Sequence, residues 1–386
     1  MFILKVAPRE YADPWAQPFE DRLAALAKGD KRVVYFYESP DNSTFRYRVY
    51  NMIQALGQAD RGISAAYFCA SEIDRLGEIV DRADVLVICR SRYTDKLNRV
   101  LTRAKNKGKR VFFDVDDLVF DPDYIHLLLA TLDQDFKHPK MWDHWYAYVG
   151  RIGAVLRACD RVIVTNSYLA SRVTQYVNKP VSVIPNFLNK EQMAISREIF
   201  QEKKGGQFSR SEEIHLGYFS GTPSHNKDFE IVSNVLARLL ENDRRIRVRV
   251  VGFLELKGPI QNYKSQIEFY PLSDFINLQR LIGEVEINLV PVQDNIFTNC
   301  KSELKYFEAG ITGTVTLASP TVTLASAIQD GENGFIANAF QWDAKLQCLL
   351  ENMESYPVIA EKAFAHSEHN YRWEHQVKLI EATLFG

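Results

Sequence analysis

The sequence predicts an α/β protein with two doubly wound parallel sheets, one in each of two domains. Short apolar runs, rich in branched residues, alternate with segments of helical periodicity along nearly the whole chain. Such alternation is typical of parallel sheets covered by helices. A polar, charged stretch interrupts it once, at 190–213. The length of 386 residues exceeds what one compact core usually holds, so we expect two domains.

The interruption sets the expected domain boundaries. We predict a first domain at residues 1–189, a linker at 190–213 and a second domain from residue 214. The linker is predicted from composition, because the stretch includes the run KKGGQFSRS.

Composition limits the expected partners and compartment. The net charge is only −2, which gives no support for nucleic acid as the main partner. Five cysteines, Cys69, Cys89, Cys159, Cys300 and Cys348, are scattered without zinc spacing, as in proteins of a reducing cytosol. No stretch approaches the roughly 18 apolar residues of a membrane span, and the first residues do not resemble a signal peptide. We expect a cytoplasmic protein with at most peripheral contact at the inner face of the membrane.

The first half contains six strand-like runs, separated by loops and helical patterns. They lie at residues 32–37, 65–69, 85–89, 111–115, 161–165 and 181–184. The loop after the first run leads into a helix that begins near Arg46 and Arg48. Their guanidinium groups are suited to grip a phosphate or carboxylate, and open α/β sheets bind ligands at this end of a strand. Two surface arginines on a first helical turn are the alternative.

Three carboxylates follow the strand-like run at 111–115 or end it, namely Asp114, Asp116 and Asp117. They are candidates for metal ligands, a general base or anchors for sugar hydroxyls. The spacing lacks the regular ligands and glycine of a calcium loop. A helix cap is the simpler interpretation of one of them. We expect at least one to contact an acceptor molecule.

Two other segments of this half have two interpretations each. Lys96 to Arg110 is a basic helix, either a membrane-surface patch or a sheet-packing helix with a solvated face. Helical region 124–157 has an aromatic cluster that either lines a sugar or lipid groove or belongs to the core: Trp142, His144, Trp145, Tyr146 and Tyr148.

The second half repeats the alternation, with strand-like runs at 214–219, 246–251, 267–270, 285–292 and 314–318. The first run leads into the loop SGTPSHNKD. There Gly221 permits close backbone approach, Thr222 carries a hydroxyl, His225 is a possible proton donor and Lys227 a cation. Such a loop between strand and helix is suited to a diphosphate. It matches neither a Walker sequence nor G-x-G-x-x-G.

The stretch DNIFTNCKSELKYFEAG, residues 294–310, follows the strand-like run at 285–292. We expect a helix from Ser302 or Glu303, with unpaired N–H groups in its first turn suited to phosphate. Lys301 and Lys305 add positive charge, and Glu308 is placed to accept hydrogen bonds from ribose hydroxyls. An ordinary strand–helix connection with solvated lysines is the alternative.

Several motifs in order resemble the nucleotide-sugar-dependent glycosyltransferases of the GT-B fold, especially the retaining group that builds bacterial surface polysaccharides, of glycosyltransferase family 4 type. In the second half these are FSGTPSHNKDF, KSELKYFEAG and DGENGF. In the first half FRYRVYNMIQAL, FDVDDLVFD and VTNSYLA…VIPNF are similar to the same group. The likeness covers nearly the whole chain from about Arg32.

The resemblance implies roles for matching positions. Glu308 matches the second glutamate of the group's E-x7-E motif and would hold the donor ribose, and Lys227 would contact the donor diphosphate. Ser302 would offer backbone amides to phosphate, and Ser319, at a strand end, would face the donor. The resemblance also implies a second domain at 214–368, closed on the nucleotide side by the turn before Phe335, and a last helix at 369–386 that packs back on the first domain.

Three departures from the group's pattern are visible. The first glutamate of E-x7-E falls at Cys300, and Thr222 stands where an arginine is often found. The carboxylates at 114–117 replace a histidine of the first domain. The residues that would contact the donor sugar or its departing phosphate are therefore not specified by the resemblance.

The implied activity is transfer of a sugar, of hexosyl type, from a nucleotide diphosphate sugar to a hydroxyl of a glycan or lipid-linked glycan, with retention and without metal or other cofactor. Three sets of residues are expected: catalytic Lys227, Lys301 and Asp117; donor-binding Gly221, Thr222, His225, Ser302, Lys305, Glu308 and Ser319; and acceptor-side Arg46, Arg48, Asp114 and Asp116. A nucleotide-sugar epimerase and a non-catalytic partner subunit of the same fold are the alternatives.

Overall fold

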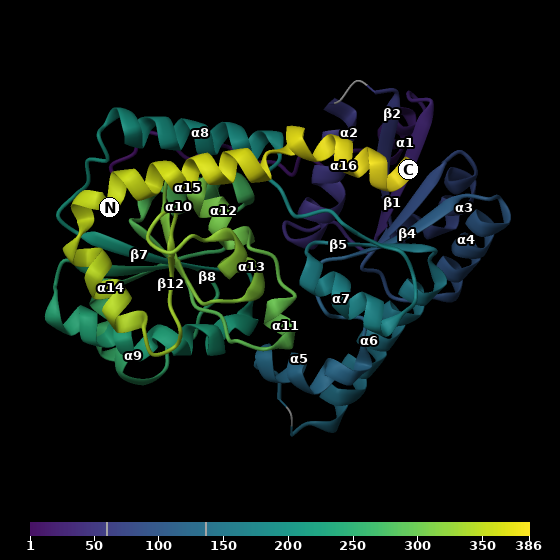
Figure 1. The fold of residues 1–386 in the computed structure, drawn as a ribbon. Coiled ribbons are helices and arrows are strands. Elements are labelled where there is room, and N and C mark those ends of the chain that lie inside the picture. Colours follow the sequence, from purple (N-terminus) through teal and green to yellow (C-terminus); the bar gives the residue numbers. More distant parts are fainter. Residues whose placement is uncertain (59–60, 136) are drawn as a thin grey trace.

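The computed structural model describes residues 1–58, 61–135 and 137–386. It contains two parallel six-stranded sheets, which lie in separate lobes (Figure 1). The predicted α/β class with two doubly wound domains is confirmed.

The first sheet has the strand order β2-β1-β3-β4-β5-β6, and every neighbouring pair is parallel. Its strands are β1 (Lys31–Tyr37), β2 (Ile63–Cys69), β3 (Val85–Cys89), β4 (Arg110–Val115), β5 (Arg161–Val164) and β6 (Val181–Val183). The helices of this half are α1 (Phe19–Leu26), α2 (Asn51–Gln58), α3 (Ile73–Asp81), α4 (Asp95–Asn106), α5 (Ile125–Thr131), α6 (Pro139–Ala158) and α7 (Ser167–Tyr176). A π-helical turn, Arg46–Tyr50, leads into α2.

The second sheet has the order β12-β11-β10-β7-β8-β9 and is also parallel throughout. Its strands are β7 (Ile214–Ser220), β8 (Ile246–Gly252), β9 (Ile267–Tyr270), β10 (Ile287–Val290), β11 (Val315–Ala318) and β12 (Phe335–Ile336). The remaining helices are α8 (Lys190–Gly205), α9 (Asn226–Asn242), α10 (Phe275–Glu284), α11 (Ile296–Asn299), α12 (Leu304–Gly310), α13 (Val322–Ala327), α14 (Trp342–Glu351), α15 (Tyr356–Tyr371) and α16 (Trp373–Phe385).

Short polar side chains define where several helices begin. Thr94, Asn166, Asn189 and Asp274 each accept a hydrogen bond from a backbone N–H in the first turn of α4, α7, α8 and α10. Each bond satisfies a donor that has no partner within the helix. These polar residues therefore mark the carboxyl edges of the sheets, where strands end and helices start.

Helix α4 packs on the sheet, and its basic face is matched by acidic neighbours. Leu97, Val100, Leu101 and Ala104 are buried. Lys96 lies 2.7 Å from Asp74 of α3, and Arg103 of α4 lies 2.5 Å from Asp81 of α3. The pattern is that of the sheet-packing interpretation, with much of the positive charge neutralised by α3.

The stretch at 190–213, predicted as a linker, is instead largely the helix α8. Asn189 caps it, and Met193, Ile195, Ile199 and Phe200 are buried. The ring of Phe200 stacks on Phe364 of α15, with centroids 3.7 Å apart. The composition did not reveal this helix, because many charged residues on the exposed face hid apolar positions that recur at helical spacing.

The two ends of the described chain lie in opposite lobes (Figure 1). Phe2 is buried in the core of the second domain, and its N–H donates to Glu284 O (2.9 Å). Val377, Ile380 and Leu384 of α16 pack into the core on one face of the first sheet. The first residues therefore belong with the second domain and not with the first, while α16 lies against α2 of the first domain, as the resemblance implies.

The burial of α16 against the first domain predicts a stability effect. Ile380 is fully buried, so Ile380→Ala should lower the free energy of unfolding by about 2–5 kcal/mol through lost burial and a cavity. The exposed Lys378 on the same helix supplies the control, Lys378→Ala. Urea unfolding followed by circular dichroism measures both. Equal midpoints for the two variants would contradict a structural role for α16.

Candidate functional site

Each sheet has a point where its strand order reverses, and these points define the candidate site. In the first sheet β2 and β3 lie on opposite sides of β1, so the order reverses between β1 and β3. In the second sheet β8 and β10 lie on opposite sides of β7, so the order reverses between β7 and β10. Open α/β sheets bind ligands beyond the carboxyl ends of their strands at such points. The loops at 38–45 and 90–94 meet this condition in the first domain, and those at 221–225 and 291–295 in the second.

Side chains at the carboxyl edge of the first sheet contact the segment before α12. Asn186 Nδ2 donates to Ser302 Oγ (2.9 Å), and Asn166 Nδ2 donates to Cys300 O (2.8 Å). Lys301 Nζ lies 3.3 Å from Asp117 Oδ1. The fold thus brings together Lys301 and Asp117, which the sequence places in one catalytic set although they are far apart in the chain.

Asp116 and Asp117 share a cation that the sequence analysis missed, Arg90. Its Nη1 donates to Asp116 Oδ1 (3.0 Å), Asp117 Oδ2 (3.3 Å) and Thr44 Oγ1 (3.1 Å). The Thr44 hydroxyl donates in turn to Asp116 Oδ2 (2.7 Å). Burial acts to raise the pKa of Asp116. The positive charges of Arg90 and Arg48 and the hydrogen bond from Thr44 outweigh burial, so the pKa of Asp116 is lowered. The Asp116 carboxylate is therefore held in its charged form.

Arg90 has a backbone φ of +34°, which residues with side chains rarely adopt. Its N–H donates to Asp114 O (2.8 Å), and its side chain lies over the end of β4. Strained residues of this kind cluster at functional sites. The sequence signal was available, since Arg90 directly follows a predicted strand, but its importance depends on β3 lying between β1 and β4.

Arg48 and Asp114, predicted on the acceptor side, form a buried structural pair. Arg48 Nε and Nη2 donate to the two oxygens of Asp114 (2.8 and 2.9 Å). Arg48 Nη1 donates to Ile184 O (2.8 Å), and both charged side chains are 0% exposed. Neither group can reach an acceptor without breaking the pair, which ties the π-helical turn to β4 and to the loop after β6.

His225 and Asp228 form a hydrogen-bonded pair beyond β7. His225 Nδ1 lies 2.9 Å from Asp228 Oδ2, and Gln293 donates to Asp228 Oδ1 through its N–H (3.0 Å) and Nε2 (3.1 Å). The loops after β7 and β10 are thereby joined. Burial lowers the pKa of His225, and the nearby charges of Lys305 and Lys301 add to this against the bond to Asp228.

Lys227 contacts the first domain. Its Nζ donates to Ala130 O (2.8 Å) and lies 3.5 Å from Asp133 Oδ1, both near the end of α5. Lys227 therefore reaches across the domain boundary, like Lys301. Gly221 and Thr222 are exposed at the start of the same loop, and Ser220 Oγ donates to Thr222 O (3.0 Å).

Lys305 lies in the first turn of α12, beside the second sheet. Its Nζ is 5.4 Å from the centroid of the Tyr218 ring, and no carboxylate among the described residues lies within ion-pair distance of it. Burial lowers the pKa of Lys305, and the positive charge of Lys301 lowers it further. The negative charges of Asp228 and Glu308 oppose this shift. Lys305 is thus a half-buried cation whose charge is only partly compensated.

Glu308 and Arg46 lie together, although the sequence assigned them to different substrates. Glu308 Oε1 accepts hydrogen bonds from Arg46 Nη2 (3.0 Å) and Gln192 Nε2 (3.1 Å), and from the Tyr47 hydroxyl. Arg46 therefore sits beside the carboxylate expected to hold ribose, and not beside Asp116.

Ser319 and Cys300 hold the backbone of the site. Ser319 Oγ accepts from Val292 N–H (2.9 Å), which fixes the segment after β10. Cys300 is fully buried and packs with Phe297 in the core of the first domain. Burial raises the pKa of its thiol to about 12. Cys300 therefore makes apolar contact between the domains where the resembling family has a charged glutamate.

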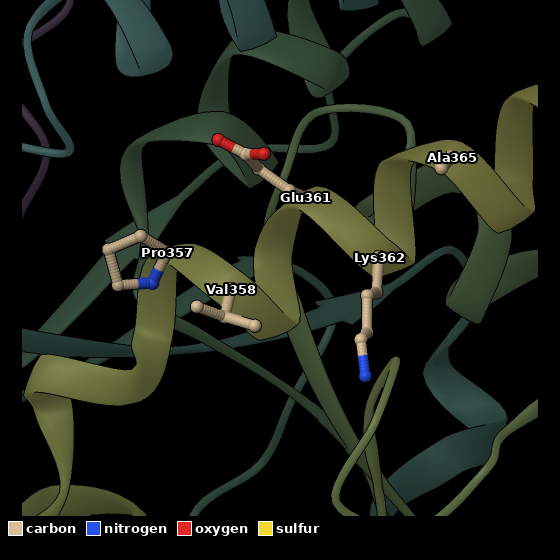
Figure 2. A pocket seen from close by; sticks show the side chains of 5 residues that line it. All are labelled: Pro357, Val358, Glu361, Lys362 and Ala365. Carbon is tan, nitrogen blue, oxygen red and sulfur yellow. The ribbon is translucent and has the colours of Figure 1, made fainter.

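Two pockets of the described surface are lined by residues other than the predicted site residues. Figure 2 shows one of about 390 Å³ on α15, lined by Pro357, Val358, Glu361, Lys362 and Ala365. Another, of about 440 Å³, is lined by Gln134, His138, Lys140, Met141, His144 and Trp145. It uses part of the predicted aromatic cluster, of which Trp142, Trp145 and Tyr148 also pack against the core. The cluster thus serves both the core and a surface hollow.

The described residues contain no group of three or more His, Cys, Asp and Glu side chains arranged to hold a metal ion. None of the helices they form is long and apolar enough to cross a bilayer.

No protein-family model and no curated protein matches the chain, but solved structures share its fold. HepE of Anabaena in complex with UDP has a TM-score of 0.62 at 13% identity, over 91% of this chain and 99% of HepE. Sucrose-phosphate synthase of Thermosynechococcus elongatus has a TM-score of 0.61 at 13% identity, over 91% of this chain and 97% of its own.

A glycosyltransferase of Rickettsia africae has a TM-score of 0.59 at 12% identity, over 92% of this chain and all of its own. HepE has also been solved with UDP and glucose, and with UDP-glucose. These likenesses confirm the GT-B fold for this chain.

The low pKa of His225 predicts a pH effect on stability. In the unfolded chain His225 takes up a proton below about pH 6.5, whereas the folded protein does so only at lower pH. The unfolded state therefore binds more protons in this window, and folding loses stability as the pH falls. His225→Gln removes that loss. Between pH 7 and 5 the stability difference should move in favour of the variant, by at most about 1.4 kcal/mol per pH unit.

Urea unfolding at a series of pH values measures the difference. His138→Gln, at an exposed histidine, is the control. A difference between wild type and His225→Gln that stays constant over this range would contradict a buried neutral His225.

Proposed function

We propose that this protein is a glycosyltransferase that moves a sugar from a nucleoside diphosphate sugar to a hydroxyl of a glycan or glycolipid. The observation that carries the proposal is the meeting of opposite charges where the two domains of the GT-B fold join. Lys301 and Lys227 of the second domain lie 3.3 and 3.5 Å from Asp117 and Asp133 of the first.

The lysines suit the charge that develops on a departing diphosphate. Breaking the glycosidic bond leaves negative charge on the phosphate oxygens, and fixed cations stabilise it. Helix α12 has only seven residues, so we assign this task to Lys301, Lys305 and Lys227 and not to the helix dipole. Ser302 lies beside Lys301, where its backbone is available to the same phosphates.

The ion pairs between the domains also indicate how the donor would enter. A diphosphate offers the lysines oxygen acceptors with more charge than Asp117 or Asp133. We expect phosphate to replace these carboxylates as partner of Lys301 and Lys227. Asp117 then becomes available to the acceptor.

Asp117 is our candidate for contact with the acceptor hydroxyl, with Asp116 and Arg90 beside it. Arg90 bonds both carboxylates. Its bond to Asp117 Oδ2 would hold that carboxylate in place while Oδ1, released by Lys301, contacts the acceptor. We extend the proposal to retention of configuration at the transferred sugar, a hexose. Reaction without a metal is also part of it, since the lysines supply the positive charge.

The donor base, the acceptor and the location belong to the same proposal. HepE has been solved with UDP-glucose, which supports testing uridine nucleotides first. Polysaccharide biosynthesis in the cytoplasm, with a lipid-linked acceptor at the inner face of the membrane, is part of this proposal.

A nucleotide panel tests the proposal most directly. A nucleoside diphosphate at 100 times its Kd should stabilise the native state by about 2.7 kcal/mol, visible as a rise in Tm with UDP, GDP or ADP. Incubation with the matching sugar nucleotide and glycan acceptors should then give a transferred sugar, unaffected by EDTA. Stabilisation by none of the nucleotides would overturn the proposal. A changed donor sugar without any acceptor would indicate an epimerase instead, and binding without turnover a non-catalytic subunit.

The role of Lys301 predicts a kinetic effect. Lys301→Ala should lower kcat by about 10²–10³, the usual cost of one lost group that stabilises transition-state charge. Lys264→Ala, at an exposed lysine on the second domain, is the control and should keep kcat. Full turnover by Lys301→Ala at saturating donor would exclude Lys301 from the reaction.

A further inference from the structure

The carboxylate of Glu308 is enclosed by side chains from outside its own helix. Arg46 and Tyr47 come from the π-helical turn of the first domain, and Gln192 comes from the first turn of α8. The exposed fractions of these four residues are 5% for Glu308, 4% for Arg46, 3% for Tyr47 and 0% for Gln192. Water is therefore largely excluded, and the bonds among them act at low dielectric.

All three donors converge on one oxygen of the carboxylate. Arg46 Nη2, Gln192 Nε2 and the Tyr47 hydroxyl donate to Glu308 Oε1. No hydrogen bond within the described part of the chain reaches Oε2, and Oε2 is not among the buried atoms without a partner. The carboxylate is thus anchored through one oxygen and presents the other.

The anchoring side chains themselves have unused capacity. Arg46 Nη1 and Gln192 Oε1 are buried and have no hydrogen-bond partner among the described residues. Leaving a buried donor or acceptor unpaired is costly. A hydroxyl both donates and accepts, so a ligand with neighbouring hydroxyls is suited to such a site.

Charge compensation is built into the same group. Arg46 Nη2 lies 3.0 Å from Glu308, and the two side chains are 5% and 7% exposed. A buried carboxylate is costly unless it is paired and hydrogen-bonded. Arg46 is fixed in turn by its Nε bond to Asn42 O (3.0 Å) and lies over the Phe275 ring, 5.0 Å from its centroid.

We propose that Tyr47, Gln192 and Arg46 are positioning residues that fix Glu308 for the ribose diol of the donor nucleotide. They hold Oε1, so that Oε2 faces the two hydroxyls in one orientation. The nucleotide site would then be completed by the first domain and α8, and these residues would set the preference for ribose over deoxyribose. This inference rests on the proposed function, because it requires a nucleotide donor.

The selectivity follows from the loss of one oriented hydrogen bond. A hydrogen bond from ribose to a charged group is worth about 1.5–3 kcal/mol, equivalent to roughly 10–150-fold in affinity. Without the anchor the carboxylate can rotate, and its bonds to a diol become weaker. A nucleotide that lacks the 2′ hydroxyl loses little affinity when the anchor is removed, because it makes fewer hydrogen bonds to the carboxylate.

Tyr47→Phe tests the proposal, since it removes one anchoring bond and keeps the ring. Isothermal titration calorimetry gives Kd for UDP and for 2′-deoxy-UDP, or for the matching pair of whichever nucleoside diphosphate raises the Tm most. Wild type should prefer the ribonucleotide by at least about 10-fold. The variant should prefer it by less than about threefold, with an almost unchanged Kd for the deoxynucleotide.

Tyr50→Phe is the matched control. Tyr50 ends the same π-helical turn, but its hydroxyl donates to Glu191 (3.2 Å). We expect this variant to keep the wild-type ribose preference. Gln192→Leu provides a second test if Tyr47→Phe does not fold, and Gln192→Glu should not restore the preference because it adds a second carboxylate.

The outcomes separate this inference from the proposed function. If wild type binds no nucleoside diphosphate, both are overturned. If wild type shows a ribose preference that Glu308→Ala abolishes but Tyr47→Phe and Gln192→Leu leave intact, only the positioning role is overturned. Loss of the preference in both anchoring variants, and not in Tyr50→Phe, supports it.

Discussion

The buried ion pair between Arg46 and Glu308 is the constraint on which the arrangement of the two domains depends. Each charge has its ion-pair partner in the other domain, and removing one partner of such a pair leaves an uncompensated charge in the interior. The pair therefore selects a relative position of the lobes in which the turn at 46–50 meets α12. That position also brings Lys301 to Asp117 and buries Cys300 in the core of the first domain.

The same groups serve the contact between domains and the proposed chemistry. Lys301 and Lys227 have carboxylates of the first domain as neighbours, while Glu308 has a cation of that domain. A nucleotide with a diphosphate and a diol carries both kinds of partner, an anion for the lysines and hydroxyls for the carboxylate. Under the proposed function, ligand binding and domain contact would be linked, because they would draw on the same hydrogen-bonding capacity.

Much of the fold follows from the sequence, but the site follows only in part. The strand-like runs and the pairing of a polar loop with each strand end are local patterns, and they were sufficient for the α/β class. They also marked Lys301, Asp117 and Glu308, which the structure places where the two domains meet. Arg48 and Asp114 look like equally good ligand-binding residues in the sequence. Their bidentate pair, with both side chains fully buried, depends on the approach of two segments that are far apart in the chain.

By itself the sequence determined most of the strands and their parallel arrangement, because hydrophobic period and strand length act over a few residues. Only the tertiary structure decided which polar groups are available. It made residues 190–205 a packed helix, placed Phe2 in the second domain, and gave Arg90 two carboxylates at the point where the strand order reverses. The physical reason is that burial and charge compensation depend on partners from distant parts of the chain, which no local pattern specifies.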